Sequence, residues 1–563
     1  MTDIVFRLRP HALACLAMAC APLAAPAATL PGVPNAGQLL QQVQPSGTSA
    51  PNTNPGLTIS PAATPGFTDT TPIPVSHIEL TGNTAFDTAT LHALVAQSEG
   101  RTLTLAQLDA LARRIADYYH AHGYPLMQAY LPPQTIKDGT VRIAIVEARY
   151  GQVRVENRSR IDSRLIESTL APLVPGAPVE QSTLDRSLLL AGDIPGASMR
   201  ATLGPGQAPG TSDLTVQTDP MPLLSGQVQV DNQGDRYTGR VRGSAGLALN
   251  NLLHHGDVLS INALTAGPGM TWGQVAWSAV LNGLGTQAGA SYSALRYRLG
   301  DAFESLDAHG TAHVASAWLS QPFIRSQTLN VSGRLEFDHR QLDDDIEASS
   351  LHNDRHVNSV TASLTADRND TWLGGGATRA TLAITQGVLA FDDAQAQASD
   401  ALTAATQGGF TLWSAGINRL QRLTDTMRLY VAFSYQHASR NVDTSEQWLL
   451  GGPGTVRGYP VSALSGTSGF LATVELRHDF VLPLVGVVQG TAFFDTGELT
   501  VDQFPWQAGA NHAHLSSAGV GLDWVGPHQL VARVQVAVPV GATPEAAGSR
   551  PPVQVWAQLA KGF

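Results

Sequence analysis

Apolar and polar residues alternate one by one in many short segments of the C-terminal part of the sequence. The segments 329–338 (LNVSGRLEFD), 428–435 (RLYVAFSY) and 531–538 (VARVQVAV) show this pattern most clearly. Successive side chains of a β-strand point to opposite faces, so strict alternation predicts strands with one apolar and one polar face. We count sixteen candidate strands from about residue 223 to the C-terminus, and no helical pattern among them.

The connections between these predicted strands alternate between short and long. An even number of strands with short turns at one end and long loops at the other is typical of an outer-membrane β-barrel. A secreted β-sandwich is the alternative class, and it has no reason to alternate its loop lengths in this way. The short connections are 282–285, 423–425 and 525–527, and the long ones are 341–355, 392–408, 440–466, 497–514 and 539–552.

Two units of strands and helices are predicted before the barrel. In 75–148 a strand is followed by helical spacing, in which Leu108, Ala112, Ile115 and Tyr119 recur on one face. Two further strands complete a β-α-α-β-β order, and 149–220 repeats that order. We therefore expect two small α/β domains of one architecture.

The N-terminal segments predict a signal and a linker. Residues 1–28 have a basic start, an apolar stretch and small residues at its end, which is typical of a secretory signal peptide. Both cysteines, Cys15 and Cys20, lie there, so cleavage would leave no thiol or disulfide chemistry. A lipid-bearing cysteine is the alternative, although neither has Leu three residues before it. Residues 29–74 are rich in Pro, Thr and Ser, which indicates a linker, and 36–44 can form a short helix.

Composition supports the membrane-barrel class. Only 14% of the 563 residues are charged, against roughly 25% in soluble proteins. The mean hydropathy is −0.02, and no run of about 18 apolar residues follows the signal. The net charge of −11 argues against nucleic acid as a partner.

Residues that resemble catalytic or metal sites do not form a recognisable set. His309 and His313 lie on one strand face without a third ligand at a known spacing. The acidic run 343–347 could bind Ca²⁺ weakly, but its composition favours a solvated loop. No G-x-S-x-G, H-E-x-x-H or nucleotide-binding pattern is present. We therefore predict no enzyme, no metal site and no cofactor.

Two motifs point into the predicted barrel. The loop 451–460 (GGPGTVRGYP) concentrates glycine and proline around Arg457. In 488–495, alternation places Asp495 on the polar face, opposite the residues that meet lipid. A carboxylate in the lumen invites a cation, and arginine can bind it with two nitrogens. Our hypothesis is that the loop folds back and that Arg457 pairs with Asp495, within 493–497 (FFDTG).

Together these motifs resemble those of the two-partner secretion transporters, the TpsB branch of the outer-membrane protein 85 superfamily. The resemblance covers nearly the whole mature chain and implies two POTRA domains before a barrel of sixteen strands. It also implies that the helix at 36–44 is a plug that occupies the pore at rest. The implied site residues are Val456, Arg457, Gly458 and Tyr459 of a conformational loop motif, and Phe493, Asp495 and Gly497 of its partner motif in the lumen.

The same resemblance implies an outer-membrane transporter with its POTRA domains in the periplasm. It would bind an unfolded exoprotein of the haemagglutinin or haemolysin type and pass it to the cell surface without nucleotide hydrolysis, surrounded by lipid and lipopolysaccharide. The alternatives are an assembly factor for other barrels and a passive porin, which would not need two α/β domains. The expected boundaries are 1–28 (signal), 29–74 (plug helix and linker), 75–148 and 149–220 (POTRA domains) and 221–563 (a membrane β-barrel of 16 antiparallel strands).

Overall fold

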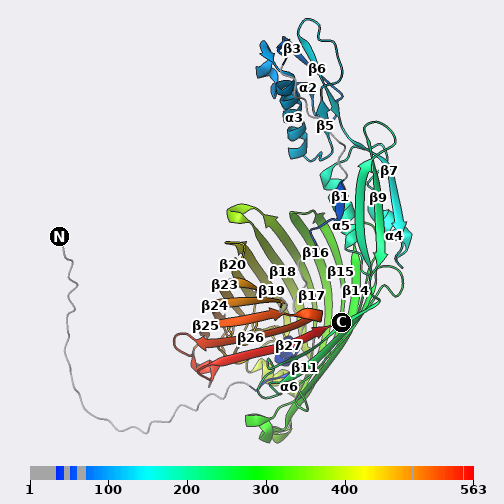
Figure 1. The fold of residues 1–563 in the computed structure, drawn as a ribbon. Helices are drawn as coiled ribbons and strands as arrows, with labels where there is room; N and C mark the ends of the chain where they lie inside the picture. Colours follow the sequence, from blue (N-terminus) through cyan, green and yellow to red (C-terminus); the bar gives the residue numbers. More distant parts are fainter. Residues whose placement is uncertain (1–32, 44–50, 60–70, 483–485, 549–550) are drawn as a thin grey trace, which may run out of the picture.

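The computed structural model places two small domains at one end of a barrel (Figure 1). The predicted signal peptide lies outside the residues that it describes, and so does most of the predicted linker. Among the described helices, none has the length and apolar character needed to cross a membrane. The described residues are 33–43, 51–59, 71–482, 486–548 and 551–563.

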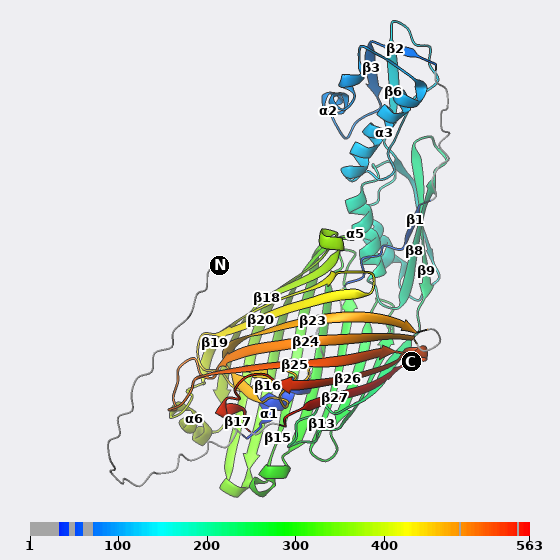
Figure 2. The ribbon, with the colours of Figure 1, turned by 60° about the vertical axis from the view of Figure 1, so that its left-hand side comes forward.

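The barrel is a closed sheet of sixteen antiparallel strands, so the predicted fold class is confirmed. Each strand pairs with its neighbour in the chain, as β23 to β27 show in Figure 2, and the last strand pairs with the first. The strands are β10 (Leu224–Asp231), β11 (Arg242–Asn250), β12 (Val258–Thr265), β13 (Met270–Val280), β14 (Gln287–Arg298), β15 (Ala308–Arg325), β16 (Leu329–Ile346), β17 (Leu351–Asp370), β18 (Gly376–Phe391), β19 (Gly408–Arg422), β20 (Met427–Ala438), β23 (Ser468–Leu482), β24 (Gly486–Thr500), β25 (His512–Val525), β26 (Leu530–Pro539) and β27 (Gln554–Gly562).

The alternation read from the sequence sets the two faces of the barrel wall. On β16, Leu335 and Phe337 are 53% and 47% exposed on the outer face. Between them, Glu336 is paired with Arg334. Apolar residues therefore cover the outside, and charged residues pair with one another on the other face.

The predicted long loop at 341–355 is wrong, because most of it is strand. β16 and β17 continue to Ile346 and from Leu351, and a single turn of 3₁₀ helix, Glu347–Ser349, connects them. Here the outer face carries polar side chains such as Asp345 and His352, while Leu342 on the lumen face is fully buried, so the apolar-outside alternation that marks a wall strand is lost. The backbone ladder nevertheless continues, since its hydrogen bonds do not require an apolar face.

The first small domain packs its helices on a three-stranded sheet in the order β3-β6-β5. Helix α3 begins with a capping box between Thr104 and Gln107. Its apolar face, including Ile115 and Tyr119, lies in the core of the domain. The elements are β2 (Ile73–Val75), β3 (His77–Thr81), α2 (Thr88–Ala93), η1 (Ala96–Ser98), β4 (Arg101–Leu103), α3 (Leu105–Ala121), β5 (Gln128–Tyr130) and β6 (Thr140–Val146).

The second small domain repeats the order of strands and helices but has an additional strand. Strand β1 (Leu57–Ile59) comes from the predicted linker and pairs in parallel with β8 at the edge of the sheet, whose order is β1-β8-β9-β7. Three residues carry no periodic signal, so the sequence pattern did not predict this strand. The other elements are β7 (Arg149–Asn157), α4 (Ser163–Leu170), α5 (Gln181–Gly192), β8 (Ala197–Pro205) and β9 (Thr211–Pro220).

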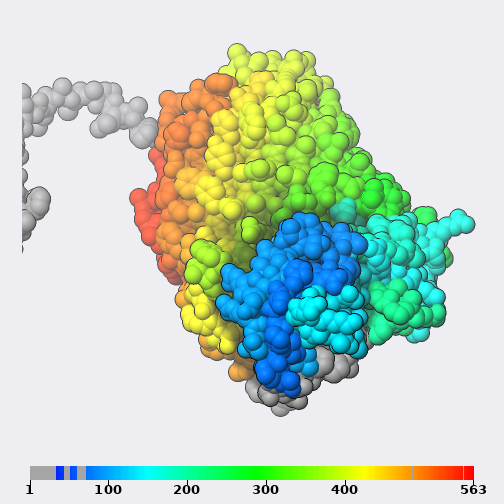
Figure 3. Space-filling model, turned by 90° about the horizontal axis from the view of Figure 1, so that it is seen from above, coloured from blue at the N-terminus to red at the C-terminus, as the bar shows by residue number. Residues whose placement is uncertain are grey.

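Polar contacts join the second small domain to the barrel end that carries the short turns. Arg325, at the end of β15, binds Asp193 with Nε–Oδ2 and Nη2–Oδ1 distances of 2.7 and 2.8 Å. Gln327 in the following turn donates to Asp185 of α5 at 2.9 Å. The small domains consequently stand over one side of this barrel end (Figure 3).

Candidate functional site in the barrel lumen

The connection between β20 and β23 folds into the lumen instead of extending away from the barrel. It forms a small ribbon from β21 (Trp448–Leu450) and β22 (Leu464–Gly466). Val456 and Tyr459 at its tip are fully buried, in a cluster that includes Leu499 and Leu515 of the wall. Burial of this apolar surface fixes the loop against the wall.

Arg457 is the central residue of this loop and contacts Asp495 on β24 through both sides of its guanidinium group. The Nε–Oδ2 distance is 2.8 Å and the Nη2–Oδ1 distance is 2.6 Å. Nη1 lies 2.8 Å from Oε1 of Glu475 on β23, and the guanidinium carbon lies 3.4 Å from the ring centre of Phe493. The side chains of Arg457 and Asp495 are only 5% and 0% exposed, so these charges depend on each other.

The hydrogen bonds around this ion pair connect four wall strands. Asp495 also accepts from Thr473 on β23 at 3.1 Å and from Ser517 on β25 at 3.2 Å. The backbone carbonyl of Arg457 accepts from the indole nitrogen of Trp556 on β27 at 2.9 Å. A change in the position of this loop would therefore break contacts with β23, β24, β25 and β27 at once.

The glycines of the two motifs sit where a side chain would meet the wall or the loop. A Cβ atom on Gly458 would lie 2.7 Å from Cβ of Ser517 and 2.9 Å from the backbone nitrogen of Pro539. A Cβ atom on Gly497 would lie 2.9 Å from the carbonyl oxygen of Phe470 and 3.0 Å from Leu450. Both glycines thus allow a close approach of the loop to the wall.

Replacing Gly458 by alanine should displace the loop from the wall and weaken the Arg457–Asp495 contact. We expect a loss of about 1–3 kcal/mol in the stability of this contact region, as for other overpacked sites. Secretion of the exoprotein that the sequence resemblance implies should fall several-fold while the amount of folded barrel stays the same. The control is Gly454→Ala, because a Cβ atom there meets nothing within 4 Å. Equal secretion by the two variants would contradict this account of Gly458.

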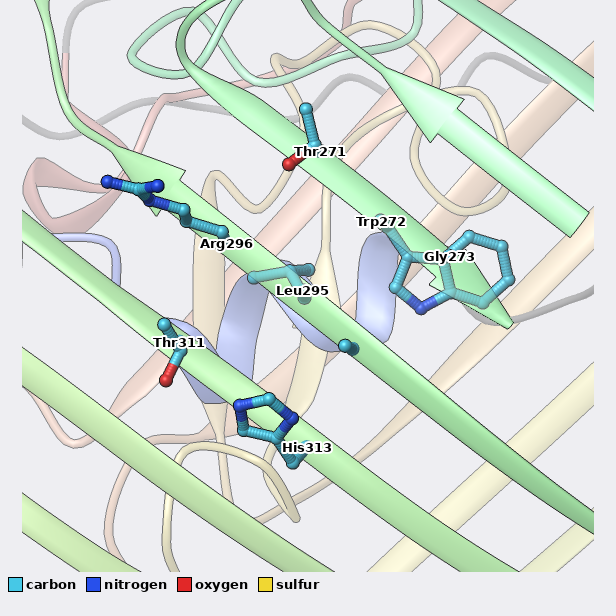
Figure 4. Close-up of a pocket in the computed structure, with 8 residues that line it drawn as sticks. Thr271, Trp272, Gly273, Leu295, Arg296, Thr311 and His313 are labelled. Atoms are coloured by element: carbon cyan, nitrogen blue, oxygen red, sulfur yellow. The ribbon is translucent and has the colours of Figure 1, made fainter. Parts of the chain in front are cut away.

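A short helix, α1 (Ala36–Val43), lies inside the barrel against the wall formed by β13 to β16 (Figure 4). Leu39, Leu40 and Val43 are buried against wall residues that include Trp272 and Leu295. The short helix that the sequence predicted for 36–44 is therefore present with its apolar face against the wall, and it ends at Val43 within the described residues.

Buried charges hold the N-terminus of α1. The backbone nitrogen of Ala36 donates to Asp344 at 2.7 Å, and the hydroxyl of Tyr297 donates to the same carboxylate at 2.6 Å. Arg355 binds Asp344 at 2.7 Å and Asp443 at 2.6 Å. An anion at a helix N-terminus is favourable, so this network stabilises the helix in its position.

The loop that carries Arg457 also contacts α1. Nε2 of Gln41 donates to the carbonyl oxygens of Thr444 and Gln447 at 2.9 and 2.8 Å. Nε2 of Gln42 donates to Ser462 at 3.2 Å. One loop therefore touches both the helix in the lumen and the Asp495 motif.

A polar cavity of about 380 Å³ lies in the lumen beside Arg457. Positively and negatively charged side chains line this cavity, on strands that continue toward the short turns. They include Arg428, Arg477, Asp479, Asp523 and Arg533. This mixed, hydrophilic lining suits the passage of a polypeptide of varied composition better than the binding of one small molecule.

The sequence patterns did not indicate a role for Glu475, Asp344 or Arg355. Alternation along β23 could have placed Glu475 in the lumen, since Val474 and Leu476 on either side of it are exposed on the outer face. Asp344 and Arg355 gave no comparable signal, because their strands were predicted as a loop. The two histidines considered above do not share a partner: His313 contacts Tyr292 at 2.8 Å, and His309 lies 3.6 Å from both Asp345 and Glu347.

Comparison with known proteins identifies the family. Residues 210–524 match the haemolysin secretion/activation protein family ShlB/FhaC/HecB, and residues 73–148 match the ShlB-type POTRA domain. The chain is 28% identical over 469 residues to the heme/hemopexin transporter protein HuxB of Haemophilus influenzae strain 86-028NP, covering 82% of each chain. It is 26% identical over 514 residues to the outer membrane transporter CdiB of Escherichia coli O6:K15:H31 (strain 536 / UPEC), covering 86% of this chain and 85% of that one.

Solved structures agree with the fold. CdiB from Escherichia coli matches with a TM-score of 0.69 at 21% identity and covers 90% of this chain and 93% of its own. CdiB from Acinetobacter baumannii matches with a TM-score of 0.61 at 18% identity, over 93% and 96%. The chain therefore belongs to the ShlB/FhaC/HecB family of two-partner secretion transporters, which secrete a partner protein across the outer membrane and hold their POTRA domains in the periplasm.

Proposed function

We propose that this transporter binds an unfolded exoprotein at the edge of a periplasmic sheet and passes it through the barrel without nucleotide hydrolysis. The observation that carries the proposal is the pairing of β1 with β8. Strand β1 is an extended segment from elsewhere in the chain, and it adds a strand to the sheet of the second POTRA domain. Addition of a strand to a sheet edge is a general way to bind an extended peptide, since main-chain hydrogen bonds do not depend on sequence.

Strand β1 is held weakly enough to be exchanged. It pairs over three residues, from Leu57 opposite Ala201 to Ile59 opposite Leu203. Leu57 is partly buried against the core, whereas Thr58 and Ile59 are exposed. A longer client segment with apolar residues at alternate positions would bury more surface at the same edge and would displace β1.

Displacement of β1 would also act on the helix in the lumen. Val43, at the end of α1, and Leu57, at the start of β1, are 14 positions apart, which spans at most about 50 Å of extended chain. Between them, Arg325 on the barrel rim donates to the carbonyl oxygen of Asn52. A client that takes the edge of β8 would release this segment and allow α1 to leave the lumen.

Transport then follows the polar lumen past the loop of Arg457. The chain has no nucleotide-binding motif, so we propose that folding of the exoprotein outside the cell gives the transport its direction. In this scheme Arg457 and Asp495 change or hold a conformation and catalyse no reaction. We further propose that the outer apolar residues, such as Phe337 and Phe433, contact membrane lipid, and that the polar β16–β17 hairpin contacts lipopolysaccharide.

A disulfide between β1 and β8 tests whether this edge must open. Thr58 and Thr202 are register partners, and both are exposed. We expect the Thr58→Cys/Thr202→Cys variant to lose at least about nine-tenths of its secretion when oxidised, because a covalent bond prevents exchange of the strand. Secretion of a co-expressed exoprotein into the medium is measured with and without reductant, which should restore it.

The matched control joins Thr202→Cys to Thr215→Cys, the register partner on β9, where no separation is expected. The oxidised control should secrete normally. If the β1–β8 disulfide forms fully and secretion continues at the wild-type rate, the exoprotein does not enter at this edge.

A further inference from the structure

Three side chains with metal-binding atoms meet on the first POTRA domain, far from the lumen in sequence and in fold. They are His77 at the start of β3, His92 in α2 and Glu99 after η1. Nδ1 of His77 lies 2.9 Å, and Nε2 of His92 3.0 Å, from Oε1 of Glu99. The three ligand atoms all lie within 4.8 Å of one another, and the ring centres of the two imidazoles are 5.8 Å apart.

The hydrogen bonds of this cluster are crowded on one oxygen. Oε1 of Glu99 also accepts from the backbone nitrogen of Ile78 at 2.8 Å, so three donors point at an oxygen that has two lone pairs. A cation between the carboxylate and the two imidazole nitrogens would replace two of these donors. The backbone hydrogen bond could remain and orient the carboxylate, as such bonds commonly do around metal ligands.

We propose that His77, His92 and Glu99 bind a divalent transition-metal ion of the Zn²⁺ class. Two imidazoles and one carboxylate are suitable ligands for zinc, with a fourth position left for water. Ligands at the usual distances of ~2.0–2.1 Å around a tetrahedral ion are roughly 3.3–3.5 Å apart. The two nitrogen–oxygen distances must therefore open by a few tenths of an ångström, and the two imidazole nitrogens, now at most 4.8 Å apart, must come within the same range. His77 can supply this movement, because its side chain is 59% exposed.

The chemistry of the ligands selects the class of ion. Imidazole favours zinc, copper and nickel, whereas Ca²⁺ and Mg²⁺ prefer sites made of oxygen alone. The ion would join three segments of the domain: the start of β3, helix α2 and the connection from η1 to β4. These segments are adjacent to β2, through which the chain enters the domain, so a bound ion would stiffen that entrance.

Titration of the full-length protein tests the site. The chain has 17 histidines, so the measurement must be a difference between variants, made on detergent-solubilised, chelator-treated protein without a histidine tag. Zn²⁺ binding is measured by calorimetry, and Co²⁺, as a zinc substitute, is followed by its visible absorption. We expect the wild type to bind one equivalent of Zn²⁺ at this site. In the His77→Ala/His92→Ala variant the affinity for that equivalent should be at least tenfold lower.

The control is His309→Ala/His313→Ala, which removes the same number of histidines from β15 of the barrel. It should keep the equivalent and the cobalt spectrum of the wild type. Glu99→Gln provides a variant with little change in shape, and it should also weaken binding about tenfold. Equal stoichiometry and equal spectra in all four proteins would overturn the proposal, and because none of these readings uses secretion, the result is independent of the proposed function.

Discussion

Secretion of the exoprotein should collapse, to about a tenth of the wild-type level or less, when Arg457 is replaced by alanine. The substitution leaves Asp495, which is fully buried, without its cation, whereas Glu475 keeps a second partner in Arg477 at 2.6 Å. Removal of one partner of a buried ion pair costs about 3–5 kcal/mol. Since a tenfold effect corresponds to about 1.4 kcal/mol, displacement of the loop is the expected result. Secretion into the medium is measured together with heat-modifiable migration, which reports the folded barrel.

Two further variants distinguish the effect of the ion pair on secretion from the effect of the loop's shape. Arg457→Lys keeps the charge but cannot contact both oxygens of Asp495 as the guanidinium does, so it should secrete at an intermediate level. Arg457→Ala combined with Asp495→Asn removes the unpaired charge and should be less harmful than the sum of the two single changes. Additive effects, or unchanged secretion by Arg457→Ala, would show that the pair does not control transport. Loss of the folded barrel would show instead that Arg457 mainly maintains the fold.

The second large effect is expected from helix α1. Changing Leu39 and Leu40 to aspartate places two charges on a face that is buried against the wall. Each leucine loses roughly 1.5–3 kcal/mol of burial, and an unpaired charge there is less favourable still. The helix should leave the lumen. The conductance of single channels in a planar bilayer should then rise several-fold, and cells should become about tenfold more sensitive to an antibiotic normally too large to enter.

The control for this variant is Gln38→Glu, which adds a charge to the same helix at a half-buried position near Ser465. It should leave conductance near the wild-type value. Unchanged conductance in the double aspartate variant would mean that α1 does not obstruct the pore, even though it lies in the lumen.

The elements of this structure that the sequence predicted are those whose apolar residues recur with the short period of a strand or a helix. Alternation with a period of two identified the wall strands and placed Asp495 on the lumen face, and the helical spacing of Leu108, Ala112, Ile115 and Tyr119 identified helix α3. The signal disappears where the outer face becomes polar, which is why the strands beyond Gln341 were predicted as a loop. The sequence alone thus gives the faces of an element more reliably than its length.

Other features depend on contacts between distant residues, and no local pattern contains them. Strand β1 has only three residues, and it forms because the edge of β8 offers hydrogen bonds. His77, His92 and Glu99 are separated by 14 and 6 intervening residues, a spacing that matches no known metal motif, and the fold of the domain brings them together. The role of Glu475 likewise requires the position of the loop that returns to it.

The ladder that closes the barrel is the shortest one in the barrel wall among the described residues. Strands β10 and β27 pair over five residues, from Gln227 to Asp231, whereas β16 and β17 pair over eighteen. These two strands also stand at opposite ends of the barrel sequence, so their meeting has the largest loop-closure cost of any pair. Closing this seam is therefore expected to be the last step when the barrel inserts into the membrane. The β10–β27 pair should also be the first to separate on heating. The temperature at which the migration of the protein changes on a gel should therefore report the strength of this pair.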